Sequence, residues 1–129
     1  MRSLLLLVSL LYPLLALGDT QAVMLGTGTP IPTPKRAGPA TPIVVDGRAY
    51  LVDFGPGVVC RAAAASAENG GSLEALNVER LDTAFLTHLH HGHTAGLPDL
   101  VYTSWTHGRE SPLKVYGPGG TVAMAANVS

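Results

Sequence analysis

Four of the five histidines of this 129-residue chain lie within six consecutive positions, from 88 to 93. The apolar segment 83–87 comes directly before them, and the turn-forming segment 96–98, Gly-Leu-Pro, follows shortly after. A short apolar run bounded by turn residues is typical of a buried strand. The sequence therefore predicts a strand at 83–87 that leads into a loop carrying the histidines, held at both ends.

The spacing of these histidines favours a metal site. His88 and His90 are two positions apart, so on an extended chain their side chains project from the same face and could grip one ion. His93 needs a turn to reach that ion, and Gly92 can supply unusual backbone angles there. Imidazole is the commonest protein metal ligand, and three ligands leave an open position for water, as in catalytic zinc sites. We predict that His88, His90 and His93 bind the metal.

Other interpretations of the histidines stay open. One is a solvated polyhistidine loop with adventitious metal affinity. The side chain of His91 should point away from His88 and His90 by strand alternation, so we expect it to be exposed or to support a ligand from outside. A helical zinc-protease site is excluded, because no His-Glu-x-x-His motif is present and Gly92 is expected to break a helix.

Strands and helices alternate along the rest of the chain. Asp46-Gly47 supplies a tight hairpin turn, and the prolines between positions 30 and 42 exclude helix there. The order predicts an α/β domain with helices outside a sheet. The expected strands lie at 21–25, 42–45, 48–53, 83–87 and 113–116, and the expected helices at 58–68, 99–105 and 121–128, with a weaker helical turn at 72–76.

The first eighteen residues have the pattern of a secretory signal peptide. Arg2 gives a positive start, a nearly continuous apolar run follows, and small residues precede Asp19. An uncleaved anchor is the alternative, but about fifteen apolar residues interrupted by Pro13 fall short of the roughly 20 that a spanning helix needs. We expect residues 1–18 to be removed, residues 19–129 to form the domain, and the protein to be secreted or periplasmic with no stable membrane span.

Composition restricts the partners that the chain can be expected to have. The formal net charge is -1, only 13% of the residues are charged, and no run of one sign occurs, so electrostatics favour no nucleic acid partner. Cys60 is the only cysteine and cannot form a disulfide within the chain. We expect it to be a small buried residue on a helix and not a nucleophile. A homo-oligomer is left open.

The segment Thr87-His88-x-His90-x-Gly92-His93, followed by Thr-Ala-Gly-Leu-Pro, resembles the His-x-His-x-Asp-His signature of the metallo-β-lactamase superfamily. Within that superfamily it looks most like the ribonuclease Z-like and arylsulfatase-like hydrolases. The segments 25–30, 51–55 and 116–118 also fall where that group has similar pieces. The resemblance covers nearly all of the chain after the signal peptide.

This resemblance implies an αββα sandwich with one or two zinc ions between its sheets, of which this chain would form the N-terminal part. It implies hydrolysis of ester or phosphodiester bonds, sulfate esters included, by a zinc-bound hydroxide. By position, His88 and His90 match ligands of the first metal and His93 matches a ligand of the second. Asp53 matches a buried carboxylate near the site, for which we expect an orienting role.

Gly92 departs from the family pattern. It stands where the family has an aspartate that binds the second metal, and the family's remaining ligands lie beyond Ser129. We therefore expect residues 19–129 to be an incomplete domain. The expectations are an exported metal-dependent hydrolase acting on a small-molecule or ester substrate or, alternatively, a non-catalytic metal-binding remnant or a truncated fragment of such a hydrolase.

Overall fold

The computed structural model describes residues 18–29 and 31–128. Its strands are β1 (Thr20–Ala22), β2 (Thr41–Val45), β3 (Arg48–Val52), β4 (Thr83–Phe85) and β5 (Lys114–Tyr116). Its α-helices are α1 (Val58–Ala65), α2 (His91–Thr94), α3 (Leu97–Thr106) and α4 (Thr121–Ala126), and three short 3₁₀ helices are η1 (Ala67–Asn69), η2 (Glu74–Leu76) and η3 (Val78–Arg80). The predicted signal peptide, apart from Gly18, lies outside the described residues. None of the helices described is long and apolar enough to cross a membrane.

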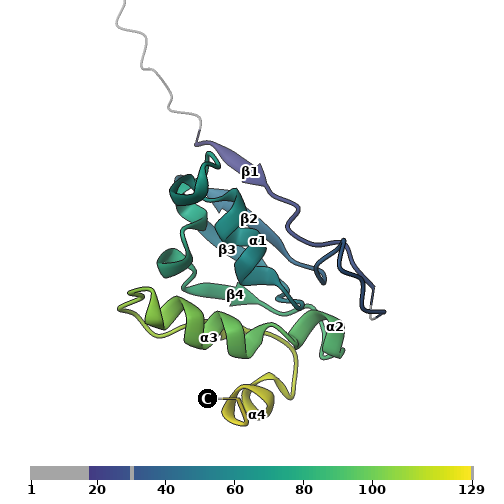
Figure 1. Cartoon of the computed structure of the whole chain (residues 1–129). Coiled ribbons are helices and arrows are strands. Elements are labelled where there is room, and N and C mark those ends of the chain that lie inside the picture. Colours follow the sequence, from purple (N-terminus) through teal and green to yellow (C-terminus); the bar gives the residue numbers. More distant parts are fainter. Residues whose placement is uncertain (1–17, 30, 129) are drawn as a thin grey trace, which may run out of the picture.

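The strands form one mixed sheet in the order β1-β2-β3-β4-β5 (Figure 1). β1 with β2 and β2 with β3 pair antiparallel, whereas β3 with β4 and β4 with β5 pair parallel. The parallel pairs are joined through α1 and α3, as parallel strands require a crossover. The α/β fold class and the alternation of elements predicted from the sequence are confirmed.

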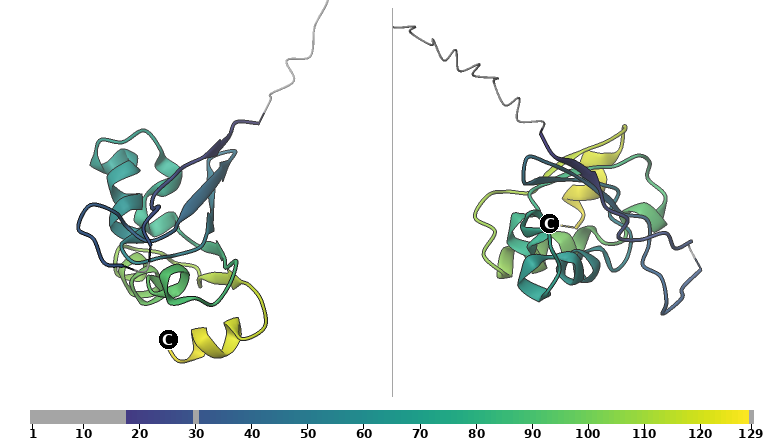
Figure 2. Two further views of the ribbon diagram at one scale, coloured as in Figure 1. Left: turned by 90° about the vertical axis from the view of Figure 1, so that its right-hand side faces the viewer. Right: turned by 90° about the horizontal axis from the view of Figure 1, so that it is seen from above.

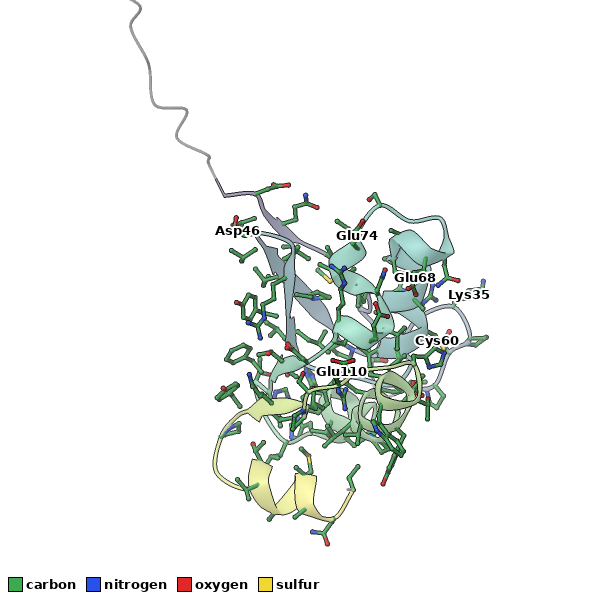
Figure 3. The ribbon with its side chains drawn as sticks, turned by 90° about the vertical axis from the view of Figure 1, so that its left-hand side faces the viewer. Lys35, Asp46, Cys60, Glu68, Glu74 and Glu110 are labelled. Atoms are coloured by element: carbon green, nitrogen blue, oxygen red, sulfur yellow. The ribbon has the colours of Figure 1, made fainter. Side chains whose placement is uncertain are left out.

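The β2–β3 hairpin has the turn that the sequence predicts. Asp46 and Gly47 adopt positive φ angles of 48° and 76°, which suit the primed turns that match strand twist. The turn sets the register, so that Val45 pairs with Arg48. Asp46 marks the hairpin tip in Figure 3, at the end of β3 opposite to the end that leads toward the histidines.

The two faces of the sheet differ in burial. Helices α1 and α3 lie against one face (Figure 2), where Leu51, Phe54 and Leu100 are almost completely buried. On the other face Phe85 and Tyr116 are 40% and 52% exposed, and their rings stack with centroids 5.2 Å apart. The described residues therefore form one sheet with helices on one side, which corresponds to one helix–sheet half of an αββα arrangement.

Several element ends differ from the sequence prediction. α1 ends at Ala65 instead of residue 68, because Ser66 leaves the helix and its hydroxyl donates to the Ala63 carbonyl over 2.8 Å. α3 begins two residues earlier than expected, at Leu97, since Pro98 suits the first helical turn. A local hydrogen bond therefore sets the end of α1, whereas the position of a proline accounts for the start of α3.

Arg109 fastens the end of α3 to the rest of the core. Its guanidinium donates to the carbonyls of Leu81 at 3.2 Å, Leu100 at 2.9 Å and Val101 at 3.1 Å. Burial lowers the pKa of Arg109 from its ordinary value, although the Asp82 charge acts in the opposite direction. An arginine at this position is thus a structural cation bonded to backbone carbonyls.

Candidate functional site

The histidine cluster lies where the parallel strands β3 and β4 end. β4 ends at Phe85, His88 and His90 follow in the loop, and His91 and His93 belong to α2. The ring centroid of His88 is 4.6 Å from that of His90 and 4.1 Å from that of His93. The structure thus brings the three predicted ligands together, and the metal-binding role of each stays a prediction.

Gly92 lies inside the one-turn helix α2, so the expectation that it would break a helix was wrong. The backbone N–H of Ala95 donates to the His91 carbonyl over 2.8 Å and closes this turn. Gly92 is buried, and a Cβ added to Gly55 would lie 2.5 Å from the Gly92 carbonyl oxygen. This close backbone packing outweighs the intrinsic helix penalty of glycine, which is only about 1 kcal/mol.

Asp53 connects the end of β3 to the histidines. Its carboxyl is buried and lies 2.7 Å from Nδ1 of His93, while Oδ1 accepts from the Thr87 backbone N–H over 2.8 Å. Its backbone N–H donates to the Phe85 carbonyl over 2.8 Å. Asp53 has a positive φ of 58°, which turns the chain out of the strand. The contact between the Asp53 carboxyl and His93 Nδ1 is what Asp53 would need in order to orient the His93 ring.

Backbone hydrogen bonds hold α2 against the β3 exit. The Phe54 N–H donates to the His93 carbonyl over 2.9 Å, and the Gly96 N–H donates to the Phe54 carbonyl over 2.9 Å. These bonds surround the residue pair Asp53 and His93. The position of His93 is therefore fixed from both its side chain and its backbone.

Thr87 is part of this network and was missed by the sequence reasoning. Its hydroxyl lies 2.9 Å from both carboxyl oxygens of Asp53 and 2.9 Å from Nδ1 of His88. The signal in the sequence was a hydroxyl residue at the end of a buried strand, directly before the first histidine. Thr87 therefore links Asp53 to a second histidine.

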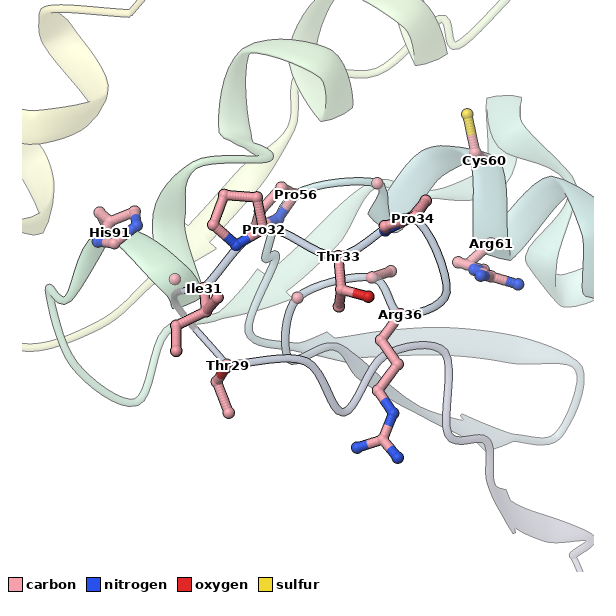
Figure 4. Close-up of a pocket in the computed structure, with 14 residues that line it drawn as sticks. Thr29, Ile31, Pro32, Thr33, Pro34, Arg36, Pro56, Cys60, Arg61 and His91 are labelled. Carbon is pink, nitrogen blue, oxygen red and sulfur yellow. The ribbon is translucent and has the colours of Figure 1, made fainter.

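A groove of about 580 Å³ adjoins the histidine cluster (Figure 4). His91 is exposed and lines this groove together with Gly92, and Arg36 and Arg61 line it from the long loop and from α1. None of the described residues that line it carries a carboxylate. The Arg61 guanidinium also donates to the Lys35 carbonyl over 3.5 Å, which ties the loop to α1. The groove combines positive charge with proximity to the histidines.

Cys60 also lines the groove. It lies on α1, as expected, but it is exposed, so the expectation of burial was wrong (Figure 3). α1 buries Val58, Val59 and Ala62 against the core, and Cys60 faces away from that stripe. In an amphipathic helix the residues opposite the buried stripe face outward, and Cys60 is one of these in α1.

The donor chemistry of the histidine cluster fits zinc, since imidazole is a common zinc ligand. Nδ1 of His88 and Nδ1 of His93 are occupied by Thr87 and Asp53, which leaves Nε2 of each ring as the available donor. Over residues 18–29 and 31–128, however, no three His, Cys, Asp or Glu side chains are arranged so that they could hold one ion. The imidazoles are thus the kind of ligand that zinc takes. A complete zinc site would need the histidine side chains to rotate or further ligands to be added.

A model of the metallo-beta-lactamase superfamily matches residues 33–127. The chain belongs to the metallo-beta-lactamase superfamily. Among the superfamily's ribonuclease Z proteins, that of Mycobacterium marinum (strain ATCC BAA-535 / M) is 43% identical over 104 residues, which cover 78% of this chain and 34% of the relative. That of Mycobacterium avium (strain 104) is 40% identical over 109 residues, covering 82% and 36%. The chain thus spans about a third of the length of these curated relatives.

Two solved structures support this family assignment or its fold. Human tRNase Z, short form, is 29% identical, with a TM-score of 0.68 over 82% of this chain and 38% of that one. The metallo-beta-lactamase fold protein YhfI from Bacillus subtilis shares the fold, with a TM-score of 0.64 over 84% and 40% at 19% identity. The resemblance and the fold class predicted from the sequence are confirmed.

The expectations of a small-molecule or ester substrate and of no nucleic acid partner were wrong. The metallo-beta-lactamase relatives are ribonucleases by name, and one solved neighbour is a tRNase. Net charge over the whole chain is a poor guide here, because two arginines gather at the groove while the acidic side chains lie elsewhere. Local charge, not the total, decides whether phosphate groups are attracted.

Proposed function

We propose that this protein is a zinc-dependent hydrolase that cleaves phosphodiester bonds in RNA. The observation that carries the proposal is a groove that is lined by Arg36 and Arg61 and reaches His91, which is next in sequence to His90. Ribonuclease Z relatives at 40–43% identity support the same chemistry. Guanidinium groups suit RNA because they pair with phosphate oxygens in a forked geometry.

His88, His90 and His93 would hold the zinc. When bound, zinc would lower the pKa of water to about 7 and polarise the scissile phosphate, which would supply a nucleophile at neutral pH. Asp53 orients His93, and Thr87 holds His88, so the two rings keep their Nε2 atoms available. Arg36 and Arg61 would neutralise phosphates of the RNA strand along the groove.

The test is cleavage of RNA by the purified full chain. The probes are a labelled tRNA transcript with a 3′ extension, DNA of the same sequence and a chromogenic sulfate ester, each with added zinc and with a chelator. We expect zinc-dependent cleavage of the RNA alone. An inert, zinc-loaded protein would refute the proposal.

A matched pair of histidine variants ties cleavage to the cluster. His90→Ala removes a proposed ligand and should abolish both stoichiometric zinc binding and RNA cleavage. His107→Ala removes the fifth histidine, which is exposed and whose Nδ1 lies 2.8 Å from the Thr103 carbonyl, outside the cluster. It should leave both properties unchanged, and equal losses in the two variants would point away from the cluster.

Gly92 favours a second candidate, a metal-binding protein without catalysis. Glycine supplies no carboxylate beside the histidines, and Gly92 is one of the residues that line the groove. The test is Gly92→Asp, with zinc stoichiometry and RNA cleavage measured in both proteins. An inactive natural chain that gains zinc and activity on this change would favour the second candidate, whereas an active natural chain rules it out.

We also propose that residues 1–18 are a cleaved signal peptide and that the protein is exported. The support is the positive start at Arg2, the apolar run that follows and the small residues before Asp19. Sequencing the amino terminus of the protein purified from its natural source should begin at Asp19. An intact Met1 on that protein would contradict the proposal.

A further inference from the structure

The Thr87 hydroxyl lies between an acid and an imidazole, and the proposed reaction assigns it no chemical step. It is 2.9 Å from each carboxyl oxygen of Asp53 and 2.9 Å from Nδ1 of His88. Thr87 also donates its backbone N–H to Asp53 over 2.8 Å, which fixes the residue from a second side. The Thr87 hydroxyl is thus fixed in position between the Asp53 carboxylate and the His88 ring.

Counting protons assigns the direction of each hydrogen bond. An ionised carboxylate only accepts, so each neighbour of Asp53 must be a donor. The Thr87 hydroxyl has a single proton, and it points this proton at Asp53. Its oxygen is then left to accept, and the partner on that side is Nδ1 of His88. Nδ1 of His93 must likewise donate to Asp53 over 2.7 Å.

We propose that Thr87 is a positioning residue that fixes the ring proton of the unligated His88 imidazole on Nδ1. The position of the imidazole proton is set by the hydrogen bond that the other ring nitrogen makes. One carboxylate thereby selects the same tautomer in two histidines, in His93 directly and in His88 through Thr87. Both rings present an unprotonated Nε2, the donor that zinc binding needs, and in this respect the inference rests on the proposed function.

Two substitutions of Thr87 separate the effect of its hydroxyl from the effect of its side-chain shape. Thr87→Val keeps the branched shape and the backbone N–H but removes the hydroxyl, so His88 loses the acceptor for its Nδ1 proton. Thr87→Ser keeps the hydroxyl and removes only a methyl group. Neither substitution changes Asp53 or His93, whose contact should persist, so His93 serves as an internal control in the same sample.

The tautomers are read in the metal-free full chain by long-range ¹H–¹⁵N correlation with ¹⁵N-labelled histidine at about pH 8. We expect protonated Nδ1 in His88 and His93 of the natural protein and of Thr87→Ser. In Thr87→Val, His88 should shift toward protonated Nε2, and His93 should not change. A natural protein in which His88 carries its proton on Nε2 overturns the proposal without any variant, as does a Thr87→Val protein with an unchanged His88.

Zinc affinity gives the second measurement. Thr87→Val should weaken zinc binding by about 10-fold, the lower end of what loss of a residue that orients a metal ligand costs, and Thr87→Ser should stay within about 3-fold. Equal losses in the two variants would contradict a role for the hydroxyl. A protein with the expected tautomers that fails to cleave RNA would refute the proposed function and leave this inference intact.

Discussion

Asp53 meets two demands with one residue. Its backbone has a φ of 58°, a region that aspartate and asparagine tolerate better than other residues with a side chain. Its buried carboxylate accepts hydrogen bonds from Thr87 and lies against Nδ1 of His93. A residue that tolerates the positive φ but has no carboxylate would leave the Thr87 N–H and His93 Nδ1 without this acceptor.

We expect Asp53→Ala to lower the free energy of unfolding by about 1–3 kcal/mol, because the Thr87 N–H and His93 Nδ1 lose their acceptor. Asp53→Asn keeps the backbone preference and one acceptor oxygen, so its loss should be smaller. Urea denaturation of both variants against the natural protein measures the difference. An asparagine variant as unstable as the alanine variant would contradict this account.

Asp82 should make the stability of the fold depend on acid pH. Burial acts to raise the pKa of Asp82, but hydrogen bonds from Thr83 and Arg48 and the charges of Arg48 and Lys114 together hold it below its ordinary value of 3.8. A carboxyl with a depressed pKa in the folded state stabilises the fold above its unfolded-state value and loses that contribution as the pH falls through the folded-state value.

Asp82→Asn should therefore lower the free energy of unfolding at neutral pH, by less than about 1 kcal/mol because the pair with Arg48 is partly exposed. The difference between the variant and the natural protein should shrink as the pH falls from neutral toward about 2, because protonation of Asp82 removes the charge that Arg48 and Lys114 stabilise. Urea titrations at the two pH values test this. A difference that persists undiminished in acid would show that packing and not charge is responsible.

At the scale of elements, the sequence predicts what neighbouring residues determine. Asp46-Gly47 encodes the hairpin turn, and the apolar segment 83–87 encodes the strand β4. The cluster of His88, His90 and His93 was also predictable, because its members lie within six positions of one another.

Features that depend on distant residues could not be predicted. α2 forms around Gly92 because the backbone of Gly55, far away in the sequence, packs against it. Thr87 acts through Asp53, which is 34 positions away. The groove likewise combines the loop carrying Arg36 with α1 and α2, so its local charge is invisible in the net charge of the chain.

Close packing between the β3 exit and α2 makes Gly55 sensitive to substitution. A Cβ there would lie 2.5 Å from the Gly92 carbonyl oxygen and 2.6 Å from the Gly38 carbonyl carbon. We expect Gly55→Ala to lower the free energy of unfolding by about 1–3 kcal/mol, as overpacking does. Gly119→Ala is the matched control, because nothing lies within 4 Å of its added Cβ, and it should change stability by no more than about 0.5 kcal/mol. Thermal and urea unfolding of both variants compare the two sites.

At the scale of the whole molecule, the two groove arginines should act as one electrostatic unit. Replacing Arg36 and Arg61 with alanine removes the positive charge that lines the groove while leaving the histidines in place. RNA affinity should fall. The slope of log affinity against log salt concentration should become shallower by about 0.7 for each phosphate of a single strand that the variant no longer neutralises.

Fluorescence titration of labelled RNA at several salt concentrations measures this slope. Arg80→Ala is a suitable control, because Arg80 does not line the groove. Its guanidinium lies 3.7 Å from the Glu74 carboxylate instead. It should leave the slope unchanged. If the double variant at Arg36 and Arg61 shows the same salt dependence of RNA affinity as the natural protein, the groove does not bind RNA.

The contact between Asp53 and His93 joins positions 40 residues apart, with α1 and β4 between them. Closing so long a loop is entropically unfavourable until β4 has paired with β3, which places the assembly of the histidines late in folding. The amides of Phe54 and Gly96, which bond across the same junction, should accordingly exchange with solvent only when the whole domain opens. The rate at which a newly made chain becomes competent to bind a ligand is then set by completion of the sheet and not by diffusion of the ligand.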